Sequence, residues 1–343
     1  MHRRICAVVA CSLLLAMPAL GASDRDHNDC MHASGEQKIV GCTRTINDAK
    51  ESPHNRAIAY KIRCGAYSDN GDNDRAIADC GEAIRIDPKF AAAYNNRCGA
   101  YSDNGDNDRA IADCIEAIQL NPKDAKTYYN RANAYLRKGD LDKATVDYNE
   151  AIRLDPKFSW PHGNLAMVHF IQTDYVSAIN DYSAAIQLDP KAELNYRGRG
   201  IVSLYAGALP KALADINQAS AIDPKNGRAA LWLEIVNNRS NLPNRLADMT
   251  SQIDMTKWPA AIIRLYLGQM TAQAVLAAAD DPSSYKQKQQ VCEANLFIGE
   301  LALQQARKDV AITSFRTAAE TCPKEEWGSS VSRIELKALG AQP

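Results

Sequence analysis

The sequence lacks an excess of charge of either sign. Its 343 residues include 40 Lys and Arg against 41 Asp and Glu, which leaves a formal net charge of −1. Attraction to a phosphate backbone needs a basic surface, so this balance excludes nucleic acid as the main partner. Hydrophobic residues make up 46% of the chain, which excludes a mainly disordered protein.

Catalytic motifs are also lacking. The sequence contains no G-x-S-x-G nucleophile elbow, no H-E-x-x-H motif and no phosphate-binding loop, and Gly198-Arg199-Gly200 falls inside a predicted helix. His27, Cys30 and His32 are residue types that bind zinc, but a fourth ligand is missing nearby, and a flexible tail with Cys30 in a disulfide is the favoured interpretation. We therefore predict no enzymatic activity, no cofactor and no metal.

Hydrophobic runs long enough to cross a bilayer are missing as well. The longest run, Ile5 to Met17, has thirteen residues, whereas a spanning helix needs about 20. This run follows His2-Arg3-Arg4 and precedes the small-residue segment Ala19 to Ala22, which is the order of a secretory signal peptide. We expect residues 1–22 to be a cleaved signal, and the protein to be periplasmic or secreted with no stable membrane span.

What the chain does contain is a strict period of 34 residues, marked by a proline at the same place in each unit. Taking each proline as position 32 defines units 57–90, 91–124, 125–158, 159–192 and 193–226. Small residues recur at positions 8, 20 and 27, and glycine stands at position 15 in four of the five units, as two closely packed helices joined by a turn require. This pattern resembles the tetratricopeptide repeat. The resemblance implies an all-α superhelix of stacked helix pairs, with a concave groove lined by the first helix of each pair.

The array weakens at both ends. We expect a half repeat within 23–56, five repeats over 57–226, an irregular helical segment over 227–291, and a sixth repeat over 292–325 followed by a capping helix at 327–339, within 292–343. The runs 230–233, 265–268, 293–299 and 335–340 resemble, in the same order, stretches of the NlpI family of bacterial envelope lipoproteins. That family implies an adaptor that brings peptidoglycan hydrolases to a tail-specific protease. This chain departs from it in having more repeats and in lacking a lipid-attachment cysteine, since Cys6 and Cys11 lie before or inside the apolar run.

Eight cysteines remain after residue 22, an even number that fits an oxidising compartment. Positions 8 and 24 face each other across an antiparallel pair, as do positions 1 and 31. This register predicts the disulfides Cys64–Cys80, Cys98–Cys114 and Cys292–Cys322, with Cys30–Cys42 completing the set. A rival pairing joins successive units through Cys42–Cys64 and Cys80–Cys98, and a third interpretation is that these cysteines only pack as small buried residues.

Arginine at position 7 and aspartate at position 23 recur in four units and should meet across each pair. We predict a structural ladder of ion pairs rather than a set of ligand-binding arginines. The fourth unit has Leu165 in place of the arginine, which leaves Asp181 without this partner.

Positions 2, 5, 6, 9, 12 and 13 of each first helix should line the groove. Asparagine recurs at position 6, where a row of amides suits an extended peptide backbone, although surface asparagines are often only solvated. Asn96, Asn130 and Lys126, with Lys61, match only part of the carboxylate clamp of chaperone-binding relatives. The clamp is incomplete because position 9 of the first unit is Gly65 and position 6 of the third is Asn130 rather than a cation. The candidate groove residues are Asn96, Lys126, Tyr129, Asn130, Asn133, Trp160, Asn164, Met167 and Arg197.

The sequence therefore predicts an exported scaffold whose partners are other proteins or extended peptides, and it gives no indication of oligomeric state. One alternative is an envelope enzyme that uses segment 227–291, with Trp258 and Tyr266 lining a pocket. A second alternative, a cytosolic chaperone adaptor, is excluded if the mature chain begins near Ser23.

Overall fold

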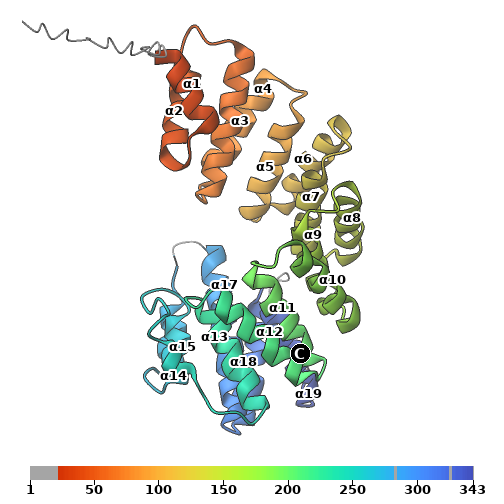
Figure 1. The fold of residues 1–343 in the computed structure, drawn as a ribbon, viewed down its shortest axis with the longest axis vertical. Coiled ribbons are helices and arrows are strands. Elements are labelled where there is room, and N and C mark those ends of the chain that lie inside the picture. Colours follow the sequence, from red (N-terminus) through yellow and green to blue (C-terminus); the bar gives the residue numbers. More distant parts are fainter. Residues whose placement is uncertain (1–21, 282–283, 324–326, 343) are drawn as a thin grey trace, which may run out of the picture. The chain divides into compact units, whose positions relative to one another are not determined.

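A computed structural model describes residues 22–281, 284–323 and 327–342, and within these ranges every regular element is a helix (Figure 1). The expected signal peptide lies outside the described residues except for Ala22, the first residue of helix α1. Contacts divide the chain into two compact units, the first ending at Pro88 and the second beginning at Lys89. Each unit is an array of helices packed in antiparallel pairs.

The described part of the first unit, residues 22–88, holds four helices, which are α1 (Ala22–His32), α2 (Gly35–Asn47), α3 (Pro53–Asp69) and α4 (Asn73–Ile86). The second unit begins with four helix pairs, which are α5 (Ala91–Asp103) and α6 (Asn107–Leu120), α7 (Ala125–Lys138) and α8 (Leu141–Leu154), α9 (Ser159–Ile171) and α10 (Tyr175–Leu188), and α11 (Glu193–Tyr205) and α12 (Leu209–Ile222). The chain continues through α13 (Gly227–Arg239), α14 (Leu246–Met249), α15 (Ala260–Tyr266), α16 (Ala272–Ala278), α17 (Ser284–Gln304), α18 (Lys308–Thr321) and α19 (Trp327–Ala338). The predicted all-α class of stacked helix pairs is confirmed.

The start of each second helix follows from two adjacent residues in the repeat. An aspartate side chain caps α4, α6, α8 and α10 by accepting a hydrogen bond from the backbone N–H three residues later. The residue before the second helix's N-cap takes a left-handed conformation, and in four units it is glycine, with φ between 76° and 83°; in the fifth unit this glycine precedes Ala208 rather than an aspartate. The fourth unit has Thr173 there, at φ 62°. Glycine adopts this conformation without steric cost and a β-branched residue does not, so the fourth pair turns under local strain.

Within each pair, a small residue at position 8 packs against a large one at position 24. Ala132 shares a buried cluster with Tyr148, and Ala166 shares one with Tyr182. At Gly200 the fit is closest, because an added Cβ would lie 2.7 Å from Cδ1 of Ile216. The helices of a pair therefore approach only when the side-chain volumes at the two positions are complementary.

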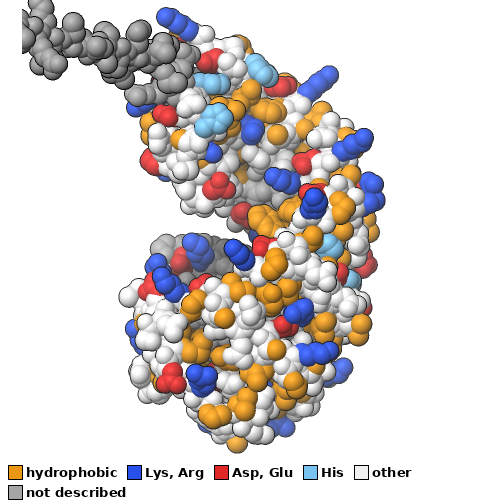
Figure 2. All heavy atoms as spheres, viewed as in Figure 1, with side chains coloured by type: hydrophobic (Ala, Val, Ile, Leu, Met, Phe, Trp, Pro, Cys, Tyr) orange, Lys and Arg blue, Asp and Glu red, His pale blue; other side chains and the backbone are white. Residues whose placement is uncertain are grey.

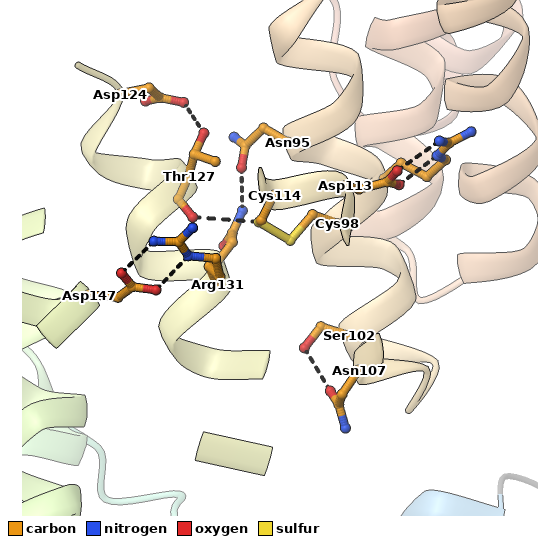
Figure 3. The surroundings of a disulfide bond; sticks show 12 residues. Asn95, Cys98, Ser102, Asn107, Asp113, Cys114, Asp124, Thr127, Arg131 and Asp147 are labelled. Atoms are coloured by element: carbon orange, nitrogen blue, oxygen red, sulfur yellow. Dashed lines mark hydrogen bonds and ion pairs between the residues drawn. A yellow bond between two sulfur atoms is a disulfide. The ribbon is translucent and has the colours of Figure 1, made fainter. Parts of the chain in front are cut away.

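In the first two repeats a disulfide takes the place of this small-and-large contact. The pairs Cys64–Cys80 and Cys98–Cys114 each have their Cα atoms 5.5 Å apart, and all four cysteines are fully buried. Figure 3 shows the second bridge, with Sγ of Cys114 also directed at the carbonyl of Thr127 in the next helix. Cys30–Cys42 and Cys292–Cys322 have Cα separations of 4.4 and 4.8 Å. The cysteines thus lie in the three pairs that the repeat register predicts and in the fourth pair, Cys30–Cys42, that was expected to complete the set, and not in the rival pairing.

The predicted ladder of ion pairs is confirmed. Each arginine at position 7 donates from two nitrogens to the aspartate at position 23 (Figure 3 shows Arg131 with Asp147), at distances between 2.6 and 2.8 Å. Each guanidinium also lies 5.6 to 5.8 Å from the centre of a tyrosine ring at position 4, close enough for a cation–π contact. The pairs are Arg63–Asp79, Arg97–Asp113, Arg131–Asp147 and Arg199–Asp215.

The fourth pair departs from the ladder, and Asp181 is not left alone there. Nδ1 of His169, at position 11, lies 2.8 Å from Oδ2 of Asp181. A second histidine, His162, stands at position 4, where the other units have tyrosine. Burial lowers the pKa of the His162 imidazole and raises the pKa of the Asp181 carboxyl. Histidine therefore replaces tyrosine at positions 4 and 11 of this unit, while Leu165 stands at the arginine position.

Three boundaries differ from those expected from the sequence. The segment expected to carry a flexible tail and a half repeat forms a complete pair, because residues 22–32 fold as α1 and pack on α2. Helix α13 continues the array beyond the fifth repeat by packing on α12 and α11. Helix α17 begins at Ser284, eight residues before the expected start of the last pair at 292.

Charge and hydrophobicity on the surface agree with the composition. Figure 2 shows Lys and Arg side chains interspersed with Asp and Glu on the visible face. Among the described residues, no helix combines the length and the apolar character that crossing a bilayer requires.

The ladder should stabilise the fold far more than exposed ion pairs do. Replacing Arg131 by Gln leaves the Asp147 carboxylate, 3% exposed, without its cation, and we expect a loss of about 3 kcal/mol in the free energy of unfolding. The matched control is Arg153→Gln, because Arg153 pairs with Glu150 on the surface and its side chain is 67% exposed, so this change should cost far less stability than Arg131→Gln. Urea unfolding followed by circular dichroism measures both, and equal losses would contradict the structural role of the ladder.

The bridges should be present in protein purified from an oxidising compartment. Proteolysis without reduction, followed by mass spectrometry, should give the linked peptides 64–80, 98–114 and 292–322, with 30–42 as the fourth. Peptides linking Cys42 to Cys64 or Cys80 to Cys98 would show that the bridges join successive units instead.

Candidate functional site

A cavity of about 530 Å³ lies along the first helices of the repeats in the second unit. This volume falls within the range of about 300–1,000 Å³ that ligand sites occupy. Helices α7, α9, α11 and α13, which follow one another in Figure 1, form one wall, and α17 and α19 form the other. The lining residues are Tyr129, Asn133, Leu136, Arg137, Asn164, Met167, Leu194, Arg197, Arg228, Trp232, Gln289, Cys292, Glu293, Leu296, Phe297, Trp327 and Gly328.

Helix α17 is held across the inner face by contacts with α13. Nε and Nη2 of Arg228 donate to the two carboxylate oxygens of Glu293 at 2.7 and 2.9 Å. Nε1 of Trp258 donates to the same carboxylate at 2.7 Å. The rings of Trp232 and Phe297 pack edge to face, with centroids 5.6 Å apart. Glu293 is therefore a shared acceptor that closes one end of the cavity.

A buried charged cluster fixes the same helices farther along. Nη2 of Arg239 donates to Glu300 at 2.8 Å and to Glu335 at 2.6 Å, and the hydroxyl of Tyr205 donates to Glu300 at 3.1 Å. These residues join α11, α13, α17 and α19. Burial of the carboxyl raises the pKa of Glu300 to about 7, against the opposing effect of Arg239, because one guanidinium serves two carboxylates.

The disulfide of the last pair forms part of the cavity wall and supports α19. A Cβ added at Gly328 would lie 2.5 Å from Sγ of Cys292 and 2.7 Å from Sγ of Cys322. Only glycine lets the backbone of α19 lie this close to the bridge. The next residue back, Trp327, packs on Phe170 and Tyr182 with ring centroids 4.8 and 6.2 Å away. The bridge and the tryptophan together position α19 against the repeats.

Amides and a tyrosine make an ordered polar network on the repeat wall. Nδ2 of Asn164 donates to Oδ1 of Asn133 at 2.8 Å and to the hydroxyl of Tyr129 at 3.3 Å. The hydroxyl of Tyr148 donates to the same oxygen of Asn133 at 2.7 Å. Burial raises the pKa of the Tyr129 hydroxyl, which therefore stays neutral at physiological pH. Asn133 also forms a side-chain hydrogen bond with Tyr129, so these amides and hydroxyls belong to one connected network.

Three arginines line the cavity, and each is paired with one carboxylate. Nε of Arg197, a residue 9% exposed, donates to Glu193 at 2.7 Å, and Arg137 donates to Ser102 and Asp103. A guanidinium carries five N–H donors, so Arg197 keeps donors for a ligand after it pairs with Glu193. The Glu193 carboxylate balances the charge of the guanidinium. Such a wall suits the carbonyl groups of a peptide better than a polyanion.

The structure brings some of the predicted groove residues to this cavity and places the others elsewhere. Tyr129, Asn133, Asn164, Met167 and Arg197 line it. Nδ2 of Asn130 donates instead to Oδ1 of Asn95 at 2.9 Å, which joins α7 to α5. Asn96 and Lys126 do not line it, and Trp160, 63% exposed, packs beside Tyr129 and Phe158 at its edge.

Sequence reasoning missed two groups of lining residues. Arg137 and Leu194 occupy positions 13 and 2 of their repeats, and Arg228 and Trp232 occupy the corresponding positions 2 and 6 of α13. The repeat register was a sufficient signal for these four. The residues from α17 and α19 had no such signal, because the period does not say where those helices pack.

Trp258 and Tyr266, which the enzymatic alternative places in a pocket of segment 227–291, form hydrogen bonds to α17 instead. The indole of Trp258 donates to Glu293, the hydroxyl of Tyr266 donates to the carbonyl of Phe297 at 3.0 Å, and neither residue lines the cavity. Cys30 lies in a disulfide, so it has no thiolate to offer a zinc ion. Among the described residues, no group of three His, Cys, Asp or Glu side chains is arranged to hold a metal ion.

Comparison with known proteins agrees with the repeat geometry. The families described as "Tetratricopeptide repeat" and "TPR repeat" match residues 65–90, 99–139 and 125–158. These segments are tetratricopeptide repeats. A tetratricopeptide repeat protein from Parabacteroides merdae is similar over 83% of this chain and 98% of its own, at 16% identity and a TM-score of 0.52. PilF from Pseudomonas aeruginosa is similar over 62% of this chain and 96% of its own, at 16% identity and a TM-score of 0.53. Comparison with curated proteins gave no match. At this identity, likeness to solved structures shows the tetratricopeptide fold alone.

The charged cluster that attaches α17 and α19 should make stability depend on pH. The folded-state pKa of Glu300, about 7, lies above the unfolded value of about 4.3, so the folded chain binds more protons between these values. Its contribution to stability is therefore present below about pH 4 and is lost as the pH rises toward and through 7. Urea unfolding of the wild type and of Glu300→Gln should show a difference that changes by up to about 3 kcal/mol between pH 5 and pH 8, with the flatter profile in the variant. Parallel profiles would contradict the shifted titration.

Proposed function

We propose that the chain is an exported scaffold that holds an extended segment of a partner protein in the cavity between its tetratricopeptide repeats and α17. The observation that carries this proposal is the lining of that cavity, where amides and paired arginines alternate with Leu194, Met167 and Trp232. An extended peptide presents backbone N–H and C=O groups together with apolar side chains, so it matches such a wall. Helix α17 opposite the repeats lets the segment be held from two sides.

The compartment and the partners follow from separate observations. The apolar run near the start of the chain and the four buried disulfides support a periplasmic or secreted location. The resemblance of the C-terminal third to the NlpI family supports a role in assembling or regulating envelope complexes of peptidoglycan hydrolases or proteases. No reaction is assigned to the chain itself.

Site-specific photo-crosslinking tests the surface directly. A photoreactive amino acid in place of Leu194, which is 55% exposed and lines the cavity, should crosslink to one defined segment of an envelope protein. The matched control is Val176, 72% exposed on the second helix α10 and away from the lining. Equal crosslinking at both positions, or conversion of envelope substrates by the purified chain alone, would overturn the proposal.

A substitution then tests binding of that crosslinked segment as a synthetic peptide. Leu194→Glu removes an apolar contact and adds a carboxylate to the wall, so the dissociation constant should rise about tenfold or more, equivalent to roughly 1.4 kcal/mol. Val176→Glu makes the same chemical change outside the cavity and should leave the dissociation constant unchanged. Isothermal titration calorimetry measures both, and both variants should keep the wild-type helical content because both side chains are exposed.

A further inference from the structure

A second cavity of about 500 Å³ lies on another part of the same unit, and its chemistry differs from that of the first. It forms where α19 and the residues after it cross the turn between α7 and α8 and the end of α9. Its walls are mainly apolar and include Leu141, Phe170, Ile171 and Ile334. The expected peptide groove does not include it.

Two of the hydroxyl side chains in this cavity are engaged by the protein itself. Oγ1 of Thr173 donates to the carbonyl of Gln172 at 2.6 Å, and Oγ of Ser329 donates to the carbonyl of Ala319 at 3.4 Å. A peptide entering here would bring an N–H and a C=O for every residue, and the apolar walls would offer them no partners. Buried polar groups without partners are costly, so an occupant without backbone amides fits better.

Two cations stand at the rim of these apolar walls. Arg333 and Lys337 line the cavity, are both exposed, and are one helical turn apart on the same face of α19. Over the described ranges, neither forms an ion pair or a hydrogen bond with a side chain. Like charges at this spacing repel each other. A bound anion between them would remove that repulsion.

We propose that this cavity binds the alkyl chain of a fatty acid and that Arg333 and Lys337 hold its carboxylate. The apolar walls take the hydrocarbon, which needs no hydrogen-bond partners. The two cations at the mouth select an anionic head group and fix its direction. The site is separate from the cavity assigned to partner peptides, so either can be occupied without the other.

Calorimetry of the full chain with octanoate, decanoate, dodecanoate and tetradecanoate below their micelle concentrations tests the apolar part. Each added methylene should lower the dissociation constant by up to about fourfold until the cavity is filled, after which the constant should level off. The alcohol of the same length should bind about tenfold more weakly than the fatty acid, and added salt should reduce this difference. A dissociation constant that is independent of chain length, or equal for acid and alcohol, would overturn the proposal.

Variants separate the two parts of the site. The double change Arg333→Gln with Lys337→Gln should weaken dodecanoate binding about tenfold and remove its salt dependence while keeping its dependence on chain length. The matched control, Lys211→Gln with Lys225→Gln, makes the same change in charge on exposed residues outside the cavity and should have no effect. Ser330→Phe should fill the cavity and abolish binding of all four acids.

One further variant keeps this proposal apart from the peptide-binding proposal. Leu194→Glu should leave dodecanoate binding unchanged, because Leu194 does not line this cavity. If Ser330→Phe keeps wild-type helical content and still binds dodecanoate as tightly as the wild type, the fatty acid lies elsewhere and the assignment is wrong.

Discussion

The contact between positions 8 and 24 sets the spacing of the helix pair in each of the five repeats. Each repeat solves the same packing problem in one of two ways, with a small residue beneath a large one, as at Gly200 and Ile216, or with a disulfide, as at Cys98 and Cys114. Either solution gives helix pairs of similar width, so the arginine–aspartate pairs fall at equivalent places along the array. A cavity or an overpacked side chain at this point would change the separation of the two helices and disturb the stacking of the neighbouring pairs.

The last helix pair uses the same contact for a different purpose. A Cβ added at Gly299 on α17 would lie 2.6 Å from the ring of Phe315 on α18, which are again positions 8 and 24. This pair does not continue the stack. It folds back on α13 through Glu293 and the Arg239 cluster, and so gives the inner face of the repeats an opposite wall. Two cavities of different chemistry result, one rich in amides and arginines and one mainly apolar.

The sequence predicted those parts of the fold whose residues recur with the period of 34 residues. The hairpins, the ion-pair ladder and three of the four cysteine pairs follow from a register of 34 residues, because their members are close in the chain. The contact of His169 with Asp181 could also have been predicted, because the fourth repeat has histidine at two positions where other repeats have tyrosine. The wall of α17 and α19 was not predictable, because Arg239 meets Glu300 and Glu335 across 61 and 96 residues with no repeat to relate them. Helix α1 was not predicted, because the 34-residue pattern is not recognisable in residues 22–32.

The order of the cysteines along the chain has a consequence for how the protein acquires its covalent structure. Counting from residue 30, every bridge joins one cysteine to the next in sequence, so no loop closed by one bridge contains a cysteine of another. Each bridge can therefore close independently of the others, and reducing one of them leaves the other three loops closed as before.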